Sequence, residues 1–173
     1  MNYDLDTPLE VQAIKVPFEK YTTKSLDDQV DYVLANNGEL VKLQNQSNLA
    51  SIELDIYEDY NSSGKYDSNI SKANQNITNL VYDILDKRGS LEYEVRSQYN
   101  NLLNSYDALS IKELEISNLA ITLNTTEKRY EVGLESKNNL ALAKENLAFA
   151  QLELDKAKLD YYVAVETYKN FVD

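Results

Sequence analysis

Cysteine, histidine and tryptophan are absent from this chain of 173 residues, and it has only two prolines and four glycines. Without cysteine or histidine, the chain has no disulfide, no thiolate or imidazole ligand for zinc, no cysteine nucleophile and no histidine acid or base. So few helix breakers over this length indicate a mostly helical protein forming one structural unit. We therefore expect no enzyme activity, no cofactor and no metal site.

Basic residues are in the minority, because 29 Asp and Glu residues outweigh 17 Lys and Arg residues and give a net charge of -12. This charge disfavours binding to nucleic acid or to anionic lipid, so we expect no nucleic-acid partner. Glu113, Glu115 and Glu127 belong to no Glu-x-x-His arrangement and are typical of solvated helix faces.

Long apolar runs are missing too, since no stretch approaches the roughly 20 residues that cross a bilayer as a helix. The opening "MNYDLDTPLEVQ" is acidic and mixed, unlike a signal peptide. We expect no direct membrane span in this chain.

The chain divides into an extended leader, residues 1–24, which holds both prolines, and a helical domain, residues 25–173. Ser25, with an acidic residue three positions later, predicts a helix N-cap. Residues 36–38 (Asn-Asn-Gly) predict a short break, and the clearest loop is "NSSGKYDSN" at residues 61–69.

A seven-residue apolar repeat runs through the middle of the chain. Its members, with one four-residue step, are Ile70, Ile77, Ile84, Leu91, Val95, Leu102, Leu109, Ile116, Leu123 and Tyr130. Such a repeat predicts a helix whose seam faces a partner helix continuously, and the four-residue step is a stutter that relaxes the supercoil. At 1.5 Å per residue this helix is roughly 90 Å long, so the protein is a rod.

A second repeat follows the turn "VGLES" and alternates large residues with alanine. Its members are Leu140, Ala143, Leu147, Ala150, Leu154, Ala157, Tyr161, Ala164 and Tyr168. The alanines allow a neighbouring helix to approach closely. Further apolar residues widen this surface, namely Phe149, Leu152, Leu159, Val163 and Val165. We expect two helical neighbours for each helix and an all-α fold, a long antiparallel coiled-coil hairpin with helices over about 25–60, 68–131 and 136–172.

Two structural interpretations stand beside any functional one. Gly133 predicts a left-handed helix C-cap, and Ser136 predicts an N-cap for the next helix. The tyrosines at seam positions, such as Tyr99, Tyr106, Tyr161 and Tyr168, are typical of interface residues with a solvated hydroxyl rather than of a sugar site.

Two stretches resemble the TolC-like outer membrane efflux protein family. They are "SLDDQVDYVLANNGELVKLQNQSNLASIELDIYEDY" and, more closely, "YEVGLESKNNLALAKENLAFAQLELDKAKLDYYVAVETY". The second carries a Tyr-x-x-Gly-x-x-Ser turn and a leucine and alanine helix that ends in Ala-x-x-Asp-Tyr. The resemblance covers about residues 25–60 and 91–173.

This resemblance implies a homo-oligomeric helical duct, an α-barrel, whose hairpin tip docks to a periplasmic adaptor or membrane-fusion protein bound to a transporter. It also implies an extracytoplasmic place in the cell envelope, with a signal peptide already removed. The docking tip would be Tyr130, Val132, Gly133, Leu134, Ser136 and Asn139. Because family members are often acidic where this chain has Asn139, a tight cation ring at the tunnel entrance is not expected.

An alternative function is a structural coiled-coil spacer or interaction protein of the envelope that conducts nothing. It is favoured by the short polar loop 61–69, which stands where family members carry strands. The chain also holds one helical repeat where family members hold two. The tip is then a hinge alone, whereas a duct needs additional copies, about six, or a further repeat.

Overall fold

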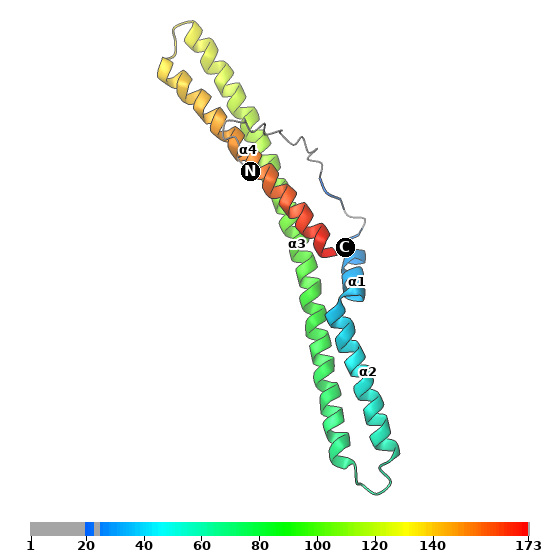
Figure 1. The fold of residues 1–173 in the computed structure, drawn as a ribbon. Coiled ribbons are helices and arrows are strands. Elements are labelled where there is room, and N and C mark those ends of the chain that lie inside the picture. The colour runs from blue at the N-terminus through cyan, green and yellow to red at the C-terminus, as the bar shows by residue number, and fades with distance from the viewer. Residues whose placement is uncertain (1–19, 23–24, 173) are drawn as a thin grey trace, which may run out of the picture.

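The computed structural model describes residues 20–22 and 25–172, which form a long rod of four helices (Figure 1). These are α1 (Leu26–Asn36), α2 (Gly38–Asp59), α3 (Asp67–Glu131) and α4 (Lys137–Val172). None of the described residues forms a strand, which confirms the all-α prediction. Most of the leader predicted over residues 1–24 lies outside the described residues.

α3 is the element that both halves of the rod share. α1 and α2 run along one half of α3 and α4 runs along the other half, each antiparallel to it (Figure 1). The end of α4 meets the start of α1 beside the middle of α3, where the Tyr168 hydroxyl donates a hydrogen bond to the Gln29 side chain. The molecule is therefore two hairpins joined through one 65-residue helix.

The break between α1 and α2 falls at Asn37, within the predicted Asn-Asn-Gly segment. Asn37 is extended, with φ of -69° and ψ of 116°, and its side-chain oxygen accepts a hydrogen bond from the Leu40 N–H at 3.1 Å. Ser25 caps α1 in the same way, accepting from the Asp28 N–H at 3.2 Å. Both caps satisfy amide groups that a helix start leaves without a partner.

The loop between α2 and α3 is short and closed by its own side chains. The Asn61 side chain accepts a hydrogen bond from the Tyr66 N–H at 2.8 Å and donates one to Asp67 at 2.7 Å. Gly64 takes a left-handed φ of 75°, and the Tyr57 and Tyr66 rings stack 5.9 Å apart. This end of the rod is thus a tight, polar turn.

The core is a line of buried side chains along α3 and its partners. Its most deeply buried members are Leu40, Val95, Leu102, Leu109 and Tyr168. α4 contacts α3 along its length and α1 at its end, and it makes no contact with α2 among the described residues. Inside one chain, then, most of α4 has one helical neighbour, so the prediction of two neighbours for each helix is not met within the chain.

Candidate functional site

The hairpin tip between α3 and α4 is a compact turn held by backbone hydrogen bonds. The Gly133 N–H donates to the Tyr130 carbonyl at 3.0 Å, and the Leu134 N–H donates to the Arg129 carbonyl at 2.8 Å. This pair of bonds, with Gly133 at φ 74°, is the Schellman arrangement that ends a helix. The Ser136 hydroxyl accepts from the Asn139 N–H at 3.1 Å, which confirms both predicted caps.

The same turn presents two large apolar side chains to solvent. Val132 is 68% exposed and Leu134 is 70% exposed. They flank Gly133, whose position the hydrogen bonds of the turn fix. Tyr130 is 40% exposed, and Ser136 and Asn139 lie on the surface as well. The predicted tip residues are therefore gathered on one exposed turn at the end of the rod.

Glu135 is a charged residue of the tip whose carboxylate makes several polar contacts. Its carboxylate accepts hydrogen bonds from the Asn139 side chain at 2.6 Å and from the Ser136 N–H at 3.2 Å. Arg129 lies 3.7 Å away. The Asn139 bond, the Ser136 bond and the Arg129 charge together lower the Glu135 pKa from its usual value. Asn139 therefore serves to hold the turn.

The large-and-alanine repeat of α4 lies along the contact with α3. Four of its members are buried, Ala150, Leu154, Tyr161 and Tyr168, and five are half-buried, Leu140, Ala143, Leu147, Ala157 and Ala164. On α3 the facing residues are buried or half-buried as well, namely Leu102, Leu109, Ile116 and Leu123. We call these two sets the inner seam.

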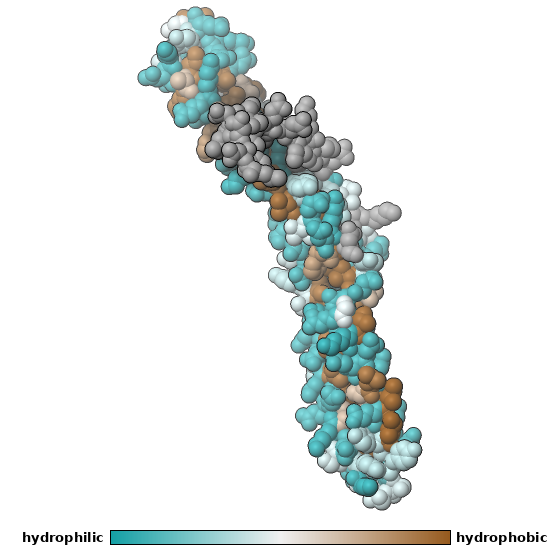
Figure 2. All heavy atoms as spheres, in the orientation of Figure 1, coloured by the Kyte–Doolittle hydropathy of each residue, from teal (hydrophilic) through white to brown (hydrophobic). Residues whose placement is uncertain are grey.

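A second apolar line runs along the other side of α4 and of the part of α3 beside it, and we call it the outer seam. On α4 it consists of Leu142, Phe149, Leu152, Leu159 and Val163, and on α3 of Ile111, Leu114 and Ile121. All eight side chains are more than half exposed. Figure 2 shows hydrophobic residues interspersed with hydrophilic ones along the visible face of the rod.

The outer seam lies almost opposite the inner seam. Each of its residues stands two or five positions after an inner-seam residue, as Leu114 stands five after Leu109. At about 100° per residue these steps place it roughly 140° to 200° around the helix from those residues, while Leu142, Phe149 and Val163 are only about 100° from the inner-seam alanine that follows each of them. Phe149, Leu152, Leu159 and Val163 were predicted as extra apolar surface, whereas Leu142 was not, and Val165 instead packs against the core. The α3 half was missed, and its signal in the sequence is short: Leu114 and Ile121 stand seven apart, with Ile111 three residues before Leu114.

Tyrosines fill the junction where α4, α1 and α3 meet. The Tyr168 ring lies 5.5 Å from that of Tyr99 and 5.8 Å from that of Tyr21, and the Tyr161 hydroxyl accepts a hydrogen bond from the Tyr21 N–H at 2.7 Å. Burial, with smaller effects of Tyr21 and Tyr99, raises the pKa of Tyr168 to about 12. The prediction of solvated hydroxyls is wrong for these two tyrosines, because each hydroxyl is bound to protein.

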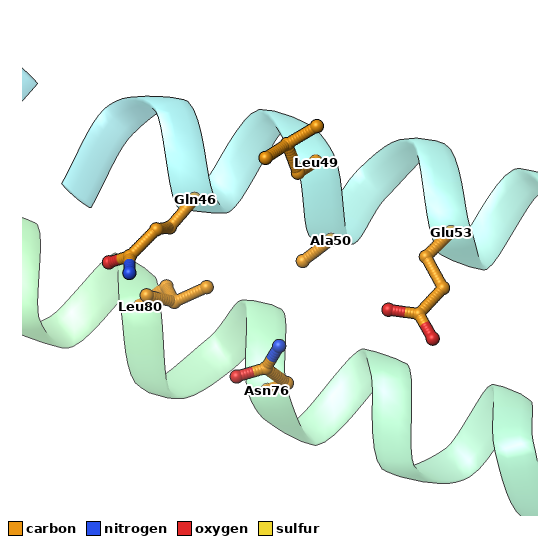
Figure 3. Close-up of a pocket in the computed structure, with 6 residues that line it drawn as sticks. All are labelled: Gln46, Leu49, Ala50, Glu53, Asn76 and Leu80. Carbon is orange, nitrogen blue, oxygen red and sulfur yellow. The ribbon is translucent and has the colours of Figure 1, made fainter. Parts of the chain in front are cut away.

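A hollow of about 310 Å³ lies between α2 and α3. Gln46, Ala50 and Glu53 of α2 and Asn76 and Leu80 of α3 point toward it in Figure 3. Small side chains line this part of α2, where Ala50 follows Ser47 along the face toward α3. Its polar side chains are exposed, so they are already solvated and do not build a ligand site.

Among residues 20–22 and 25–172, no cluster of carboxylates is placed to hold a metal ion. Within the same residues, no helix combines the length and the apolar character that crossing a membrane requires.

The described residues form an all-α rod in which α4 and the part of α3 beside it carry apolar side chains on two sides. The comparison with known families agrees: the chain belongs to the outer membrane efflux protein family, whose model matches residues 33–170. Members of this family are helical efflux ducts of the cell envelope. The resemblance noted in the sequence is thereby confirmed.

One curated relative is Endocytosis protein end4 of Schizosaccharomyces pombe, 36% identical over 84 residues. The match covers 43% of this chain but spans only 8% of the length of that protein. No solved structure matches the chain.

Proposed function

We propose that this protein is the helical duct component of an envelope efflux or export assembly, acting outside the cytoplasm. The observation that carries the proposal is the outer seam. Eight large apolar side chains are left in water along two helices, and they need a partner surface to cover them. Membership of the outer membrane efflux protein family supports an efflux or export role for the surface that the outer seam forms.

The position of the outer seam favours a wall over a compact bundle. A helix with apolar seams on adjacent sides packs into a bundle with a filled core. A helix with seams on nearly opposite sides instead joins a single layer, and a curved layer closes into a hollow barrel. Copies of this chain, associated as a homo-oligomer, would form such a wall.

The tip is the proposed docking end for a periplasmic adaptor or membrane-fusion protein, itself bound to a transporter. Val132 and Leu134 support this role because they are exposed on a turn that hydrogen bonds hold rigid, so little ordering is needed on binding. The mechanism is passive: helices form the wall, the tip engages the adaptor, and loosening of the tip opens the passage.

The test is co-purification of the adaptor and the transporter with the tagged full chain from native envelopes. Leu134→Asp should lose both partners, because it places a carboxylate in an apolar contact. Tyr60→Asp is the matched control, since Tyr60 is 72% exposed at the opposite end of the rod. If the Leu134→Asp chain retains its partners as well as the control does, the tip is not the docking surface.

A second candidate is a structural spacer of the envelope that conducts nothing. The tight turn closed by Asn61 favours it, because this turn ends the rod where a duct would continue. Solute leak through the reconstituted oligomer separates the two functions, since a spacer shows none. A wild-type chain that recovers neither adaptor nor transporter also supports the spacer.

A further inference from the structure

We infer that the outward side of α2, on the half of the rod away from the tip, binds a basic amphipathic helix of another protein. We call this surface the α2 face and define it as Leu49, Ile52, Ile56 and Tyr60. The inference does not rest on the proposed duct, because the α2 face shares no residue with the tip or with the outer seam. Burial and charge among the described residues support it.

The α2 face is an apolar line on the side of α2 that is turned away from α3. Its four side chains are 51% to 72% exposed. Leu49, Ile52 and Ile56 stand roughly 100° to 160° around the helix from Ala50, which is buried. Among residues 25–172, α2 contacts no helix other than α1 and α3, so no helix of the described chain covers this line.

The spacing of the α2 face fits a helix as its occupant. Its residues follow one another by steps of three, four and four, the steps by which one helix packs along another. From Leu49 to Tyr60 the line is about 16 Å long, which corresponds to about three helical turns of a partner.

Only acidic charges lie beside the α2 face. Glu53 stands three residues before Ile56 and Asp59 three residues after it, so a carboxylate lies about 60° to either side of the line. Asp55, three residues after Ile52, lies on the same side as Asp59. From residue 43 to residue 60 the chain has four acidic residues and no lysine or arginine. Among the described residues, none of these four forms an ion pair.

This combination of charge and apolar surface identifies the partner. A helix whose apolar line is edged by lysine or arginine complements the α2 face, since ion pairs at the edges of an apolar seam select the partner helix. The α2 face of a second copy fits poorly, because its carboxylates would oppose the same carboxylates, and anionic lipid is repelled for the same reason. The outer seam of α4 differs, because Lys156 stands in line with it, seven residues after Phe149.

A synthetic peptide of three heptads tests the inference with the full chain. It carries isoleucine at a, leucine at d, lysine at e and g, and one tryptophan at f, and its lysines keep two peptide helices from pairing. Because the protein has no tryptophan, the anisotropy of the peptide's tryptophan fluorescence reports binding directly. The wild type should bind this peptide at least about tenfold more tightly than a matched peptide with glutamate at e and g. Equal binding of the two peptides would overturn the inference.

Variants of the α2 face locate the binding surface. Ile52→Ser/Ile56→Ser should weaken binding of the lysine peptide at least about tenfold, because it removes the apolar contact and leaves the charge unchanged. Leu152→Ser/Leu159→Ser is the matched control at similarly exposed positions of α4, and it should change binding by less than about twofold. Equal effects of the two pairs would mean that the net charge alone holds the peptide, which contradicts the inference.

Removal of charge tests the acidic edges separately. Glu53→Gln/Asp55→Asn/Asp59→Asn should weaken the lysine peptide about tenfold. A control removes three charges elsewhere on the rod and should have a smaller effect, namely Asp107→Asn/Glu113→Gln/Asp160→Asn. If both triple variants weaken the peptide equally, the edges of the α2 face do not select the partner.

The same serine variant distinguishes the other occupants of the α2 face. If Ile52→Ser/Ile56→Ser lowers the mass of the protein alone in light scattering, the face is a contact between copies. If the wild type sediments with vesicles of neutral phosphatidylcholine and this variant does not, the face binds lipid. Either result overturns the inference, and neither bears on docking at the tip.

Discussion

Gly133 shows how one residue sets the shape of the tip. Its φ of 74° lies in the left-handed region, where a Cβ atom meets the neighbouring carbonyl. The space around it is otherwise open, since an added Cβ would have no neighbour within 4 Å. The requirement for glycine therefore comes from the backbone alone.

Substitution of Gly133 by alanine should lower the free energy of unfolding by roughly 1–2 kcal/mol, because alanine is strained at positive φ. Urea unfolding followed by circular dichroism measures it. Gly89→Ala is the control: Gly89 lies within α3 with open space around it, so alanine there should stabilise by about 0.5–1 kcal/mol. Equal effects of the two substitutions would contradict this account.

Helix caps and turns can be predicted from the sequence when the residues that form them lie close together in the chain. The Ser25 cap, the Ser136 cap and the left-handed Gly133 each involve residues within a few positions of one another. The bond from Tyr21 to Tyr161 joins residues 140 positions apart, and no pattern in the sequence pairs them. That contact depends on where α4 ends relative to α1.

At the scale of the elements, the tyrosine junction is where three helices are held together. Tyr168 is fully buried there and packs against rings from α3 and from the segment before α1. Its hydroxyl bonds to Gln29 of α1. Because burial raises its pKa to about 12, the folded protein binds this proton more tightly than the unfolded chain does.

Tyr168→Phe should change how stability depends on alkaline pH. In the wild type the raised pKa of Tyr168 adds to the free energy of unfolding. This stabilisation is fully present below about pH 10 and is lost as the pH rises towards 12. The variant lacks this loss, and at pH 8 it should be less stable by about 1 kcal/mol for the missing hydrogen bond.

Urea midpoints of the wild type and the variant, measured between pH 8 and pH 11, test this. The difference between them should shrink as the pH rises. Tyr60→Phe, at an exposed position, should leave the midpoint unchanged. A difference that stays constant over the whole range would mean that Tyr168 does not titrate with unfolding.

The helices themselves were largely predictable, because seven-residue repeats indicate which face of each helix packs against a neighbouring helix. The break at Asn37 and the loop after Asp59 also followed from their residues. The α3 outer seam did not, since Ile111 and Leu114 lie among polar residues and Ile121 lies beside members of the stronger repeat, which mask it. The relative level of α3 and α4 depends on their register, which contacts such as that between the Tyr106 and Tyr161 rings set in the folded structure.

At the scale of the whole molecule, association sets apolar attraction against charge. Each chain carries a net charge of -12, so copies that approach side by side repel one another. The outer seams act over contact distance, whereas the repulsion extends over the Debye length, about 30 Å at 0.01 M salt and about 8 Å at 0.15 M.

The assembly should therefore grow with ionic strength. Light scattering of the wild type at fixed concentration should give a higher mass at about 0.15 M salt than at about 0.01 M, because screening removes the repulsion and leaves the seams intact. Phe149→Ser/Leu152→Ser should remain small at both. A mass that falls as salt is added would instead mean that ion pairs hold the copies together.

The rod consists of two hairpins that share α3, and the length of each hairpin depends on a different part of α3. α4 and the α1–α2 pair occupy different parts of it, and among residues 25–172 they meet only at the tyrosine junction. Seven residues inserted into α3 above the junction, with seven in α4, would move the tip outward by about 10 Å and preserve both seams. The lower hairpin would keep every contact. The reach of the tip is thus a modular property, set by matched heptads on one side of the junction alone.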